Sequence, residues 1–235
     1  MSTVTNIISQ LGALQHADSF FPSGAVSFSQ GLETLYADRE VKDYETLASF
    51  VEGQLLHRWR TLEAPVLTLA HRLSNDLNAL AELDAEYEAM ALATELRDGS
   101  RRAGGALLSV HEKLETPRAA DYRVLIIQKK ALGHLPVAQG LIWGVIGVSA
   151  GDARVTSAHL LCTGLVSAAL RLGLVGHLDA QRVLLRVRVT LVDILTSPVV
   201  EPSRISGLFD FNAYTPATEI ATMRHETHDA RLFAN

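Results

Sequence analysis

Two consecutive uncharged stretches place the strongest constraint on how this chain can fold. They run from Leu135 to Ala150 and from Val155 to Leu170, and each has 16 residues. A helix of that length spans about 24 Å, whereas the hydrocarbon layer of a bilayer is about 30 Å thick. We therefore interpret the two stretches as central helices packed inside a bundle, and not as membrane spans.

Most other segments before Ser197 also carry the apolar spacing of helices. Four glycines, at positions 140, 144, 147 and 151, recur at helical spacing and predict a face that a neighbouring backbone can approach closely. The segment from Leu185 to Leu191 alternates as a strand does, but Leu184, Val187, Leu191 and Ile194 form a helical stripe. The expected helices are about Asn6–His16, one starting near Ser27, Tyr44–Trp59 capped by Asp43, Ala64–Leu73, Leu77–His111 with possible breaks at Gly99 and at 104–105, one between Thr116-Pro117 and Gly133, one opening at Pro136, and one from Asp179 to about Thr196.

After Ser197 the composition changes to prolines, glycine and scattered aromatic residues, which favours irregular structure. The sequence therefore predicts an all-α fold: a single multi-helix bundle, residues 1–197, with a loop-rich C-terminal extension of the same domain, residues 198–235. Because the apolar stripes all lie before Ser197, we expect the bundle to fold without residues 224–235. We also expect the extension to be mobile until a partner binds it.

Composition excludes several classes of function. The chain has 21 basic and 26 acidic residues, a formal charge of −5, so nucleic acid is not an expected partner. Cys162 is the only cysteine, so neither an internal disulfide nor a thiolate metal cluster can form. The N-terminal residues lack the features of a secretory signal, and a cytoplasmic protein is expected.

The densest motif runs from Asp18 to Glu33. Pro22 and Gly24 are typical of a turn, a following serine can cap a helix, and Gly31 allows close packing. The motif contains neither the Gly-x-Ser-x-Gly elbow of hydrolases nor the Lys-Ser/Thr pair of a phosphate loop. It predicts a specific turn and helix start, without catalysis.

This motif resembles the N-terminal signature of UreF urease accessory proteins, and further blocks of the chain resemble the same family. At Val26 the chain departs from the family, which commonly has an aromatic residue there. The matching blocks are 21–24, 29–33, 97–104, 133–140, 171–173, 223–226 and 231–233.

The resemblance implies an all-α homodimer that is not an enzyme and needs no cofactor. It implies a complex with a UreD-type protein (also called UreH) and the GTPase UreG, formed before nickel enters apo-urease. The residues that the resemblance assigns to partner binding are Pro22, Gly24, Ser29, Gly31, Glu33, Arg97, His134, Arg224, His225, Arg231 and Phe233.

The histidines leave a second hypothesis open, a small helical metal-dependent enzyme that uses residues such as Glu33, His57 and His71. Such a site needs three or more convergent ligands and an open coordination position. His225 and His228 supply only two imidazoles, without the spacing of a His-Glu-x-x-His zinc motif. We interpret that pair as a partner contact or as neutral.

Overall fold

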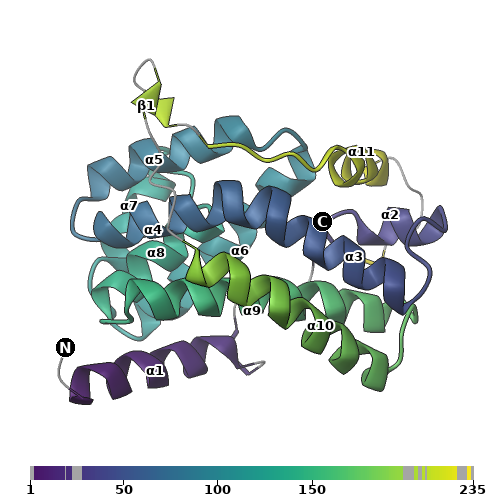
Figure 1. Ribbon diagram of the computed structural model, residues 1–235. Helices are drawn as coiled ribbons and strands as arrows, with labels where there is room; N and C mark the ends of the chain where they lie inside the picture. The colour runs from purple at the N-terminus through teal and green to yellow at the C-terminus, as the bar shows by residue number, and fades with distance from the viewer. Residues whose placement is uncertain are drawn as a thin grey trace.

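The computed structural model describes residues 3–18, 20–22, 28–197, 204–205, 208–209, 211–226 and 232–233 (Figure 1). Apart from a two-residue antiparallel strand pair, Arg204–Ile205 (β1) with Leu208–Phe209 (β2), the regular structure of these residues is helical, and the all-α prediction is confirmed. The helices are α1 Thr3–Ala17, α2 Leu32–Ala37, α3 Tyr44–Gln54, η2 Leu55–Glu63, α4 Ala64–Arg72, α5 Leu77–Met90, α6 Thr94–Lys113, α7 Ala119–Ile127, α8 Leu135–Val145, α9 Ala150–Arg171, α10 His177–Thr196 and α11 Pro216–His225.

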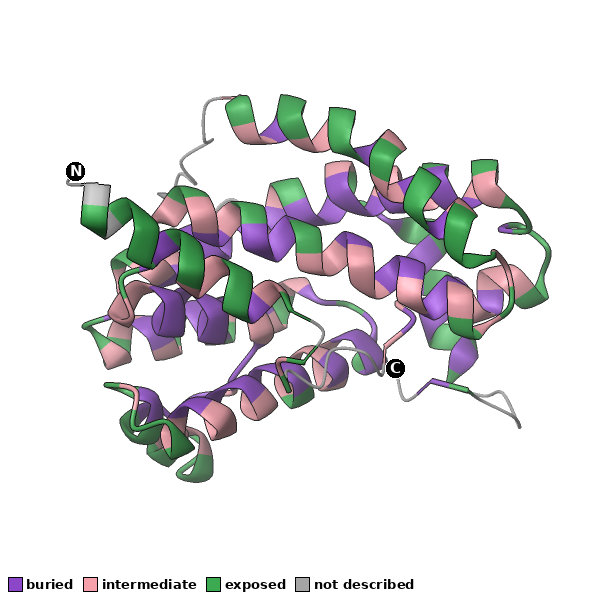
Figure 2. Ribbon diagram, turned by 90° about the horizontal axis from the view of Figure 1, so that it is seen from below, coloured by how far each residue is buried: buried purple, intermediate pink, exposed green. Residues whose placement is uncertain are grey.

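The interior consists of two hydrophobic clusters joined by the long helix α9. In the first, α4 and α6 pack on α8, with Leu67, Leu108 and Trp143 at its centre. In the second, α3 and α10 pack on each other and on α9, around Val51 and Val183. Helix α1 lies along the outside of α9, and its outer side is exposed (Figure 2).

The two uncharged stretches form α8 and α9, as expected. Helix α9 is long and apolar enough to cross a membrane by length and composition, but half of that window is buried inside the bundle. The arrangement is that of a core helix. The helical interpretation of 185–191 is confirmed as well, since α10 is continuous through it and buries Val187.

The glycine pattern is confirmed only in its first half. A Cβ atom on Gly140 would lie 2.5 Å from Cβ of Ala70 and 2.6 Å from the carbonyl oxygen of Leu67, so α8 and α4 touch backbone to backbone there. Gly144 makes the same kind of approach to Ser74. The helix needed to align all four glycines ends at Val145. Gly147 lies beyond that end and Gly151 is in the first turn of α9, and neither has such a close contact.

Several predicted boundaries are wrong. The break in 77–111 falls at residues 91–93 and leaves the glycines inside α6, where Gly104 packs against the carbonyl oxygen of Gly133. Helix α7 begins after Arg118, whose φ of 67° makes the turn, and ends at Ile127, well before Gly133. Ser27 lies outside the described residues, and α2 starts at Leu32.

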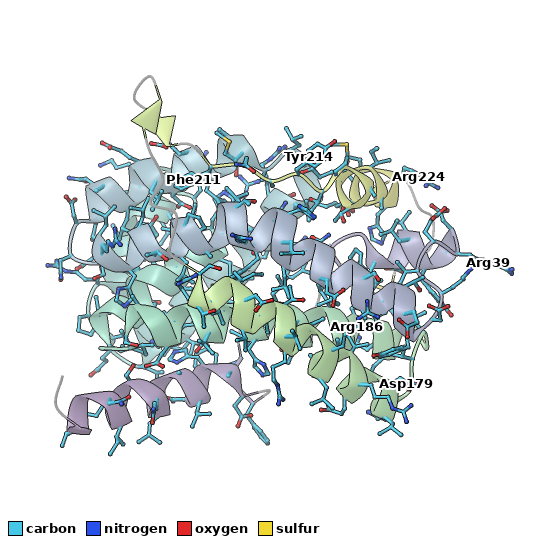
Figure 3. The ribbon with its side chains drawn as sticks, in the orientation of Figure 1. Arg39, Asp179, Arg186, Phe211, Tyr214 and Arg224 are labelled. Carbon is cyan, nitrogen blue, oxygen red and sulfur yellow. The ribbon has the colours of Figure 1, made fainter. Side chains whose placement is uncertain are left out.

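Asp43 caps α3 as predicted, in a capping box with Thr46. The same helix then widens into the π-helix η2, which no sequence pattern indicated. Two carbonyl oxygens of η2 accept hydrogen bonds from the C-terminal segment: that of His57 from the Tyr214 amide (2.8 Å) and that of Thr61 from the Asn212 amide (3.3 Å). The segment before α11 is thereby fastened along η2 (Figures 1 and 3).

The expectation that the core ends before Ser197 is wrong. Phe211 is buried in the first cluster and Phe233 in the second, and Ala221 of α11 is buried too. Helix α11 is regular, and it packs against α2 and α6. The described part of the extension therefore belongs to the folded body.

Candidate partner-binding site

The turn at Gly31 brings the N-terminal motif directly against α11. Gly31 has a φ of 81°, and a Cβ atom there would lie 2.9 Å from the carbonyl oxygen of Thr218 and 3.0 Å from Oγ1 of Thr222. Both the backbone conformation and the close approach require glycine. The buried Ser29 supports the following turn, since its Oγ accepts a 3.5 Å hydrogen bond from the Glu33 amide.

Glu33 fastens the chain's C-terminal residues to α2. Its carboxylate accepts hydrogen bonds from the backbone amides of Leu232 (2.8 Å) and Phe233 (3.2 Å). The ring of Phe233 is buried and lies 4.4 Å below the guanidinium carbon of Arg171, a cation–π contact. Glu33 and Phe233 were both expected to bind another protein, and in this structure they contact each other.

His225 lies between two carboxylates in the interior. Its Nε2 is 3.0 Å from Oε2 of Glu33, and its Nδ1 is 3.0 Å from Oε2 of Glu95 on α6. The side chain of His225 is fully buried, and both carboxylates are largely buried. Each ring nitrogen lies within hydrogen-bonding distance of a carboxylate oxygen, so this contact ties α11 to α2 and α6 at once. We call Glu33, Glu95 and His225 the latch.

Arg224 lies next to the latch but points outward (Figure 3). It forms a two-pronged ion pair with Asp38, with distances of 2.5 and 3.2 Å, and both hydrogen bonds are exposed. Hydrogen bonding to Asp38 raises the pKa of the Arg224 guanidinium. An exposed pair of this kind contributes little to stability, so Arg224 stays accessible to another protein.

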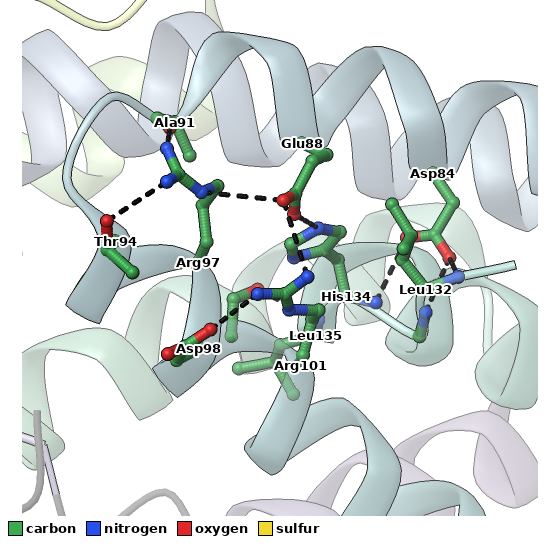
Figure 4. A network of polar contacts seen from close by, with 12 residues as sticks. Asp84, Glu88, Ala91, Thr94, Arg97, Asp98, Arg101, Leu132, His134 and Leu135 are labelled. Carbon is green, nitrogen blue, oxygen red and sulfur yellow. Dashed lines mark hydrogen bonds and ion pairs between the residues drawn. The ribbon is translucent and has the colours of Figure 1, made fainter. Parts of the chain in front are cut away.

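A second polar cluster surrounds the start of α8 (Figure 4). The buried carboxylate of Asp84 accepts hydrogen bonds from the Tyr122 hydroxyl (2.9 Å) and from the amides of Leu132 (2.8 Å), Gly133 (2.5 Å) and His134 (3.0 Å). Asp84, on α5, thereby accepts hydrogen bonds from three backbone amides of the turn before α8. Helix α8 has no side-chain cap of its own. Burial, and then the charge of Asp84, raise the pKa of Tyr122.

His134 and Arg97 meet at Glu88, one turn along α5. The His134 Nε2 is 2.7 Å from Oε2 of Glu88, and the Arg97 Nε is 3.4 Å from Oε1. Burial lowers the pKa of His134 despite the nearby carboxylates. Arg97 also donates hydrogen bonds to the carbonyl oxygens of Ala91 and Leu92, at 2.7 and 2.8 Å. These bonds hold the linker between α5 and α6 against α6.

The predicted residues thus fall into two groups. Ser29, Gly31, Glu33, Arg224, His225 and Phe233 gather around α2 and α11, whereas Arg97 and His134 belong to the cluster on α5. Pro22 is exposed and touches neither group in the contacts described. Gly24 and Arg231 lie outside the described residues, as does His228.

The carboxylates of Asp84, Glu88 and Glu95, which hold both groups together, were not predicted from the sequence. Asp84 could have been noticed, because it interrupts the buried stripe of Leu80, Leu83 and Tyr87 on α5. Glu95 carries no comparable signal.

Among the described residues, no group of three histidine, cysteine, aspartate or glutamate side chains is placed to hold a metal ion. The metal-dependent enzyme hypothesis therefore gains no support from these residues. His71 donates a 2.8 Å hydrogen bond from Nε2 to the carbonyl oxygen of Val148.

Comparison with known proteins identifies the family. A UreF family model matches residues 41–188, more than half of the chain. A urease accessory protein UreF from Haemophilus influenzae is 30% identical over 98% of both chains. Proteins of the same name from Actinobacillus pleuropneumoniae and Trichodesmium erythraeum are 28% and 29% identical, over 95% and 98% of this chain and 98% and 99% of their own. With matches of this extent, the chain belongs to the UreF family.

Proposed function

We propose that this protein is a cytoplasmic urease accessory protein that bridges a UreD-type protein (UreH) and the GTPase UreG while nickel is inserted into apo-urease. Proteins of the UreF family are accessory proteins and not enzymes, so the role is that of a scaffold. The names of the relatives support the urease assignment. The division of labour among the partners rests on the resemblance described above.

The observation that carries the proposal is the outer surface of the C-terminal extension. The latch buries His225 on one side of α11, whereas Ile220 and Met223 of the same helix are exposed. Tyr214, just before the helix, and Leu232 are exposed too. Exposed apolar side chains that are fixed on a rigid element are typical of a protein–protein interface. We assign this surface, the α11 face, to the UreD-type protein, and Arg224 lies at its edge.

A charge substitution on the α11 face tests the assignment. We expect Ile220→Glu with Met223→Glu to weaken binding of the UreD-type protein at least tenfold and to reduce recruitment of UreG and urease activation with it. These side chains are exposed, at 57% and 43%, so the fold should persist. The measurements are calorimetry with purified partners and circular dichroism.

The matched control is Val189→Glu with Val192→Glu on α10. It has the same three-residue spacing and similar exposures of 68% and 53%. The control should bind like the unmodified protein. Equal binding by the α11 variant and the unmodified protein would remove the α11 face from the interface.

We also propose that the protein is a homodimer in which α1 contributes to the contact. Five apolar side chains of α1 are exposed, namely Val4, Ile7, Ile8, Leu11 and Leu14. Such a stripe is typical of a helix that packs against a further surface. Leu11→Glu with Leu14→Glu should convert the dimer to a monomer in light scattering, and a dimer that survives both changes would exclude α1 from the interface.

A further inference from the structure

Helix α1 carries its apolar stripe on the outside, and buried polar side chains help to hold its inner side to the bundle. Its inner residues include Ser9 and His16, which are both buried. Ser9 donates a hydrogen bond to the carboxylate of Asp152 and accepts one from the Ser149 amide (2.7 Å) at the start of α9. Near the C-terminal end of α1, His16 meets His111 of α6.

The two histidines contact each other through one nitrogen of each ring. Their Nε2 atoms are 2.9 Å apart, and each residue is only 3% exposed. The Nδ1 atom of His16 is 2.7 Å from the carbonyl oxygen of Gly12, and Nδ1 of His111 is 2.8 Å from Oγ1 of Thr116. All four ring nitrogens therefore have a hydrogen-bond partner. We call His16 and His111 the histidine pair.

These contacts determine where the protons of the histidine pair lie. A carbonyl oxygen only accepts, so His16 carries a proton on Nδ1, and its Nε2 accepts from the Nε2–H of His111. One added proton fits on Nδ1 of His111, because the Thr116 hydroxyl can turn and accept it. A second added proton has no place, since both Nε2 atoms would then carry protons that face each other.

The surroundings of the histidine pair do not favour a second charge. The rings of Phe21 and Trp143 pack against His16, with centroid distances of 4.6 and 5.8 Å. Burial lowers the pKa of both histidines, and the charge of His16 lowers the pKa of His111 further. Helices α1 and α8 contribute no other charged side chain. On the other neighbouring segments, Asp18, Lys113 and Glu115 are exposed, Glu112 pairs with Arg123, Arg118 pairs with Asp121, Asp152 accepts from Ser9 and Ser149, and Arg154 is partly buried.

We propose that the histidine pair is an acid-sensitive fastening for helix α1, in which the docked rings share at most one added proton and a second proton separates them. Once α1 is released, water reaches both rings, and each binds a proton near its ordinary pKa of about 6.5. Below that pH the released state therefore binds at least one proton more than the docked state. Docking of α1 weakens as the pH falls. This inference concerns how α1 is held to its own chain, so it does not depend on the proposed dimer.

Hydrogen exchange and histidine NMR on the full chain test this inference. The protection factors of α1 amides report docking, those of α8 serve as the internal reference, and the ring Cε1–H signals report protonation. Between pH 5.5 and pH 4.5 the protection of α1 relative to α8 should fall at least about tenfold, because a difference of one proton changes the equilibrium about tenfold per pH unit. Constant relative protection over this range would overturn the proposal, and so would two fully protonated rings in a docked α1.

His111→Gln is the diagnostic variant. Its amide group can donate to neutral His16 and, turned over, can accept from protonated His16, while one titrating ring is gone. The fall in α1 protection should therefore be about tenfold smaller than in the unmodified protein. His177→Gln is the matched control, because His177 is exposed at the start of α10, and it should keep the full fall.

His16→Gln removes the other ring and checks the result independently of how well glutamine fits at position 111. It should also reduce the fall in α1 protection about tenfold. A fall as steep in both glutamine variants as in His177→Gln would mean that a different group releases α1, and the proposal would fail.

Discussion

Removing the carboxylate of Glu33 should release the C-terminal residues while the helical bundle stays folded. Glu33 accepts hydrogen bonds from the amides of Leu232 and Phe233 and faces Nε2 of His225. Glu33→Ala removes all three interactions and leaves Glu95 as the carboxylate that still faces the buried His225. The three partners, His225, Leu232 and Phe233, all lie outside the core helices α4, α8 and α9, so the packing of these helices is retained.

The magnitude follows from the kind of bond lost. A hydrogen bond to a charged group contributes about 1.5–3 kcal/mol net, and breaking a buried ion pair costs about 3–5 kcal/mol. The three interactions are not additive and Leu232 is half exposed, so we expect a loss of about 3 kcal/mol for docking of the C-terminus. This corresponds to an approximately hundredfold increase in local opening.

Native-state hydrogen exchange measures this directly. The Phe233 amide should exchange about one hundred times faster in Glu33→Ala, with unchanged exchange in α8. Glu226→Ala is the matched control, because Glu226 ends the same helix α11 and is exposed. Unchanged protection of Phe233 in Glu33→Ala, or equal loss in the control, would refute the proposed role of the latch.

Three further predictions concern the interior. Asp84→Ala leaves four donors without their acceptor and should cost about 4 kcal/mol in urea unfolding, whereas a cost below about 1 kcal/mol would contradict the assigned role. Gly140→Ala should destabilise by about 1–3 kcal/mol through overpacking against α4, while Gly53→Ala, where nothing lies within 4 Å, should stabilise by up to about 1 kcal/mol; opposite signs in thermal melts are the check. Burial, and then the charge of His16, lower the pKa of His111 to about 4, against about 6.5 in the unfolded chain. The unfolded state therefore binds more protons below pH 6.5, and stability falls as the pH drops towards 4; His111→Leu should show a smaller loss between pH 7 and pH 4.5 in denaturant titrations.

Local signals predicted the helices, because capping and apolar spacing act within a few residues. Asp43 caps α3 as expected, and the stripe through Val187 identified α10 despite the alternating pattern, since Val187 is buried while Val189 is exposed. Glycine did not mark the helix breaks. Gly104 stays helical because the turn at Gly133 packs on it, a contact between segments that the sequence does not bring together.

Several residues selected from the sequence lie together in the fold, but their contacts could not be predicted. The resemblance selected Glu33, His225 and Phe233, but their mutual contacts join positions nearly the whole chain apart and have no local signature. The π-helix η2 was missed for a similar reason. Its carbonyl oxygens pair with Asn212 and Tyr214, so part of its register depends on residues far along the chain.

The distance in sequence between Glu33 and its partners has a consequence for biosynthesis. Leu232 and Phe233 are 199 and 200 positions away, so the ribosome synthesises them long after Glu33. Chains grow at about 5–20 residues per second, and α2 therefore waits roughly ten seconds or more for the residues that complete its surroundings. During that time Gly31 and Glu33 are open to chaperones or to other chains. We expect the N-terminal motif to reach its final state only after residues 232 and 233 have left the ribosome.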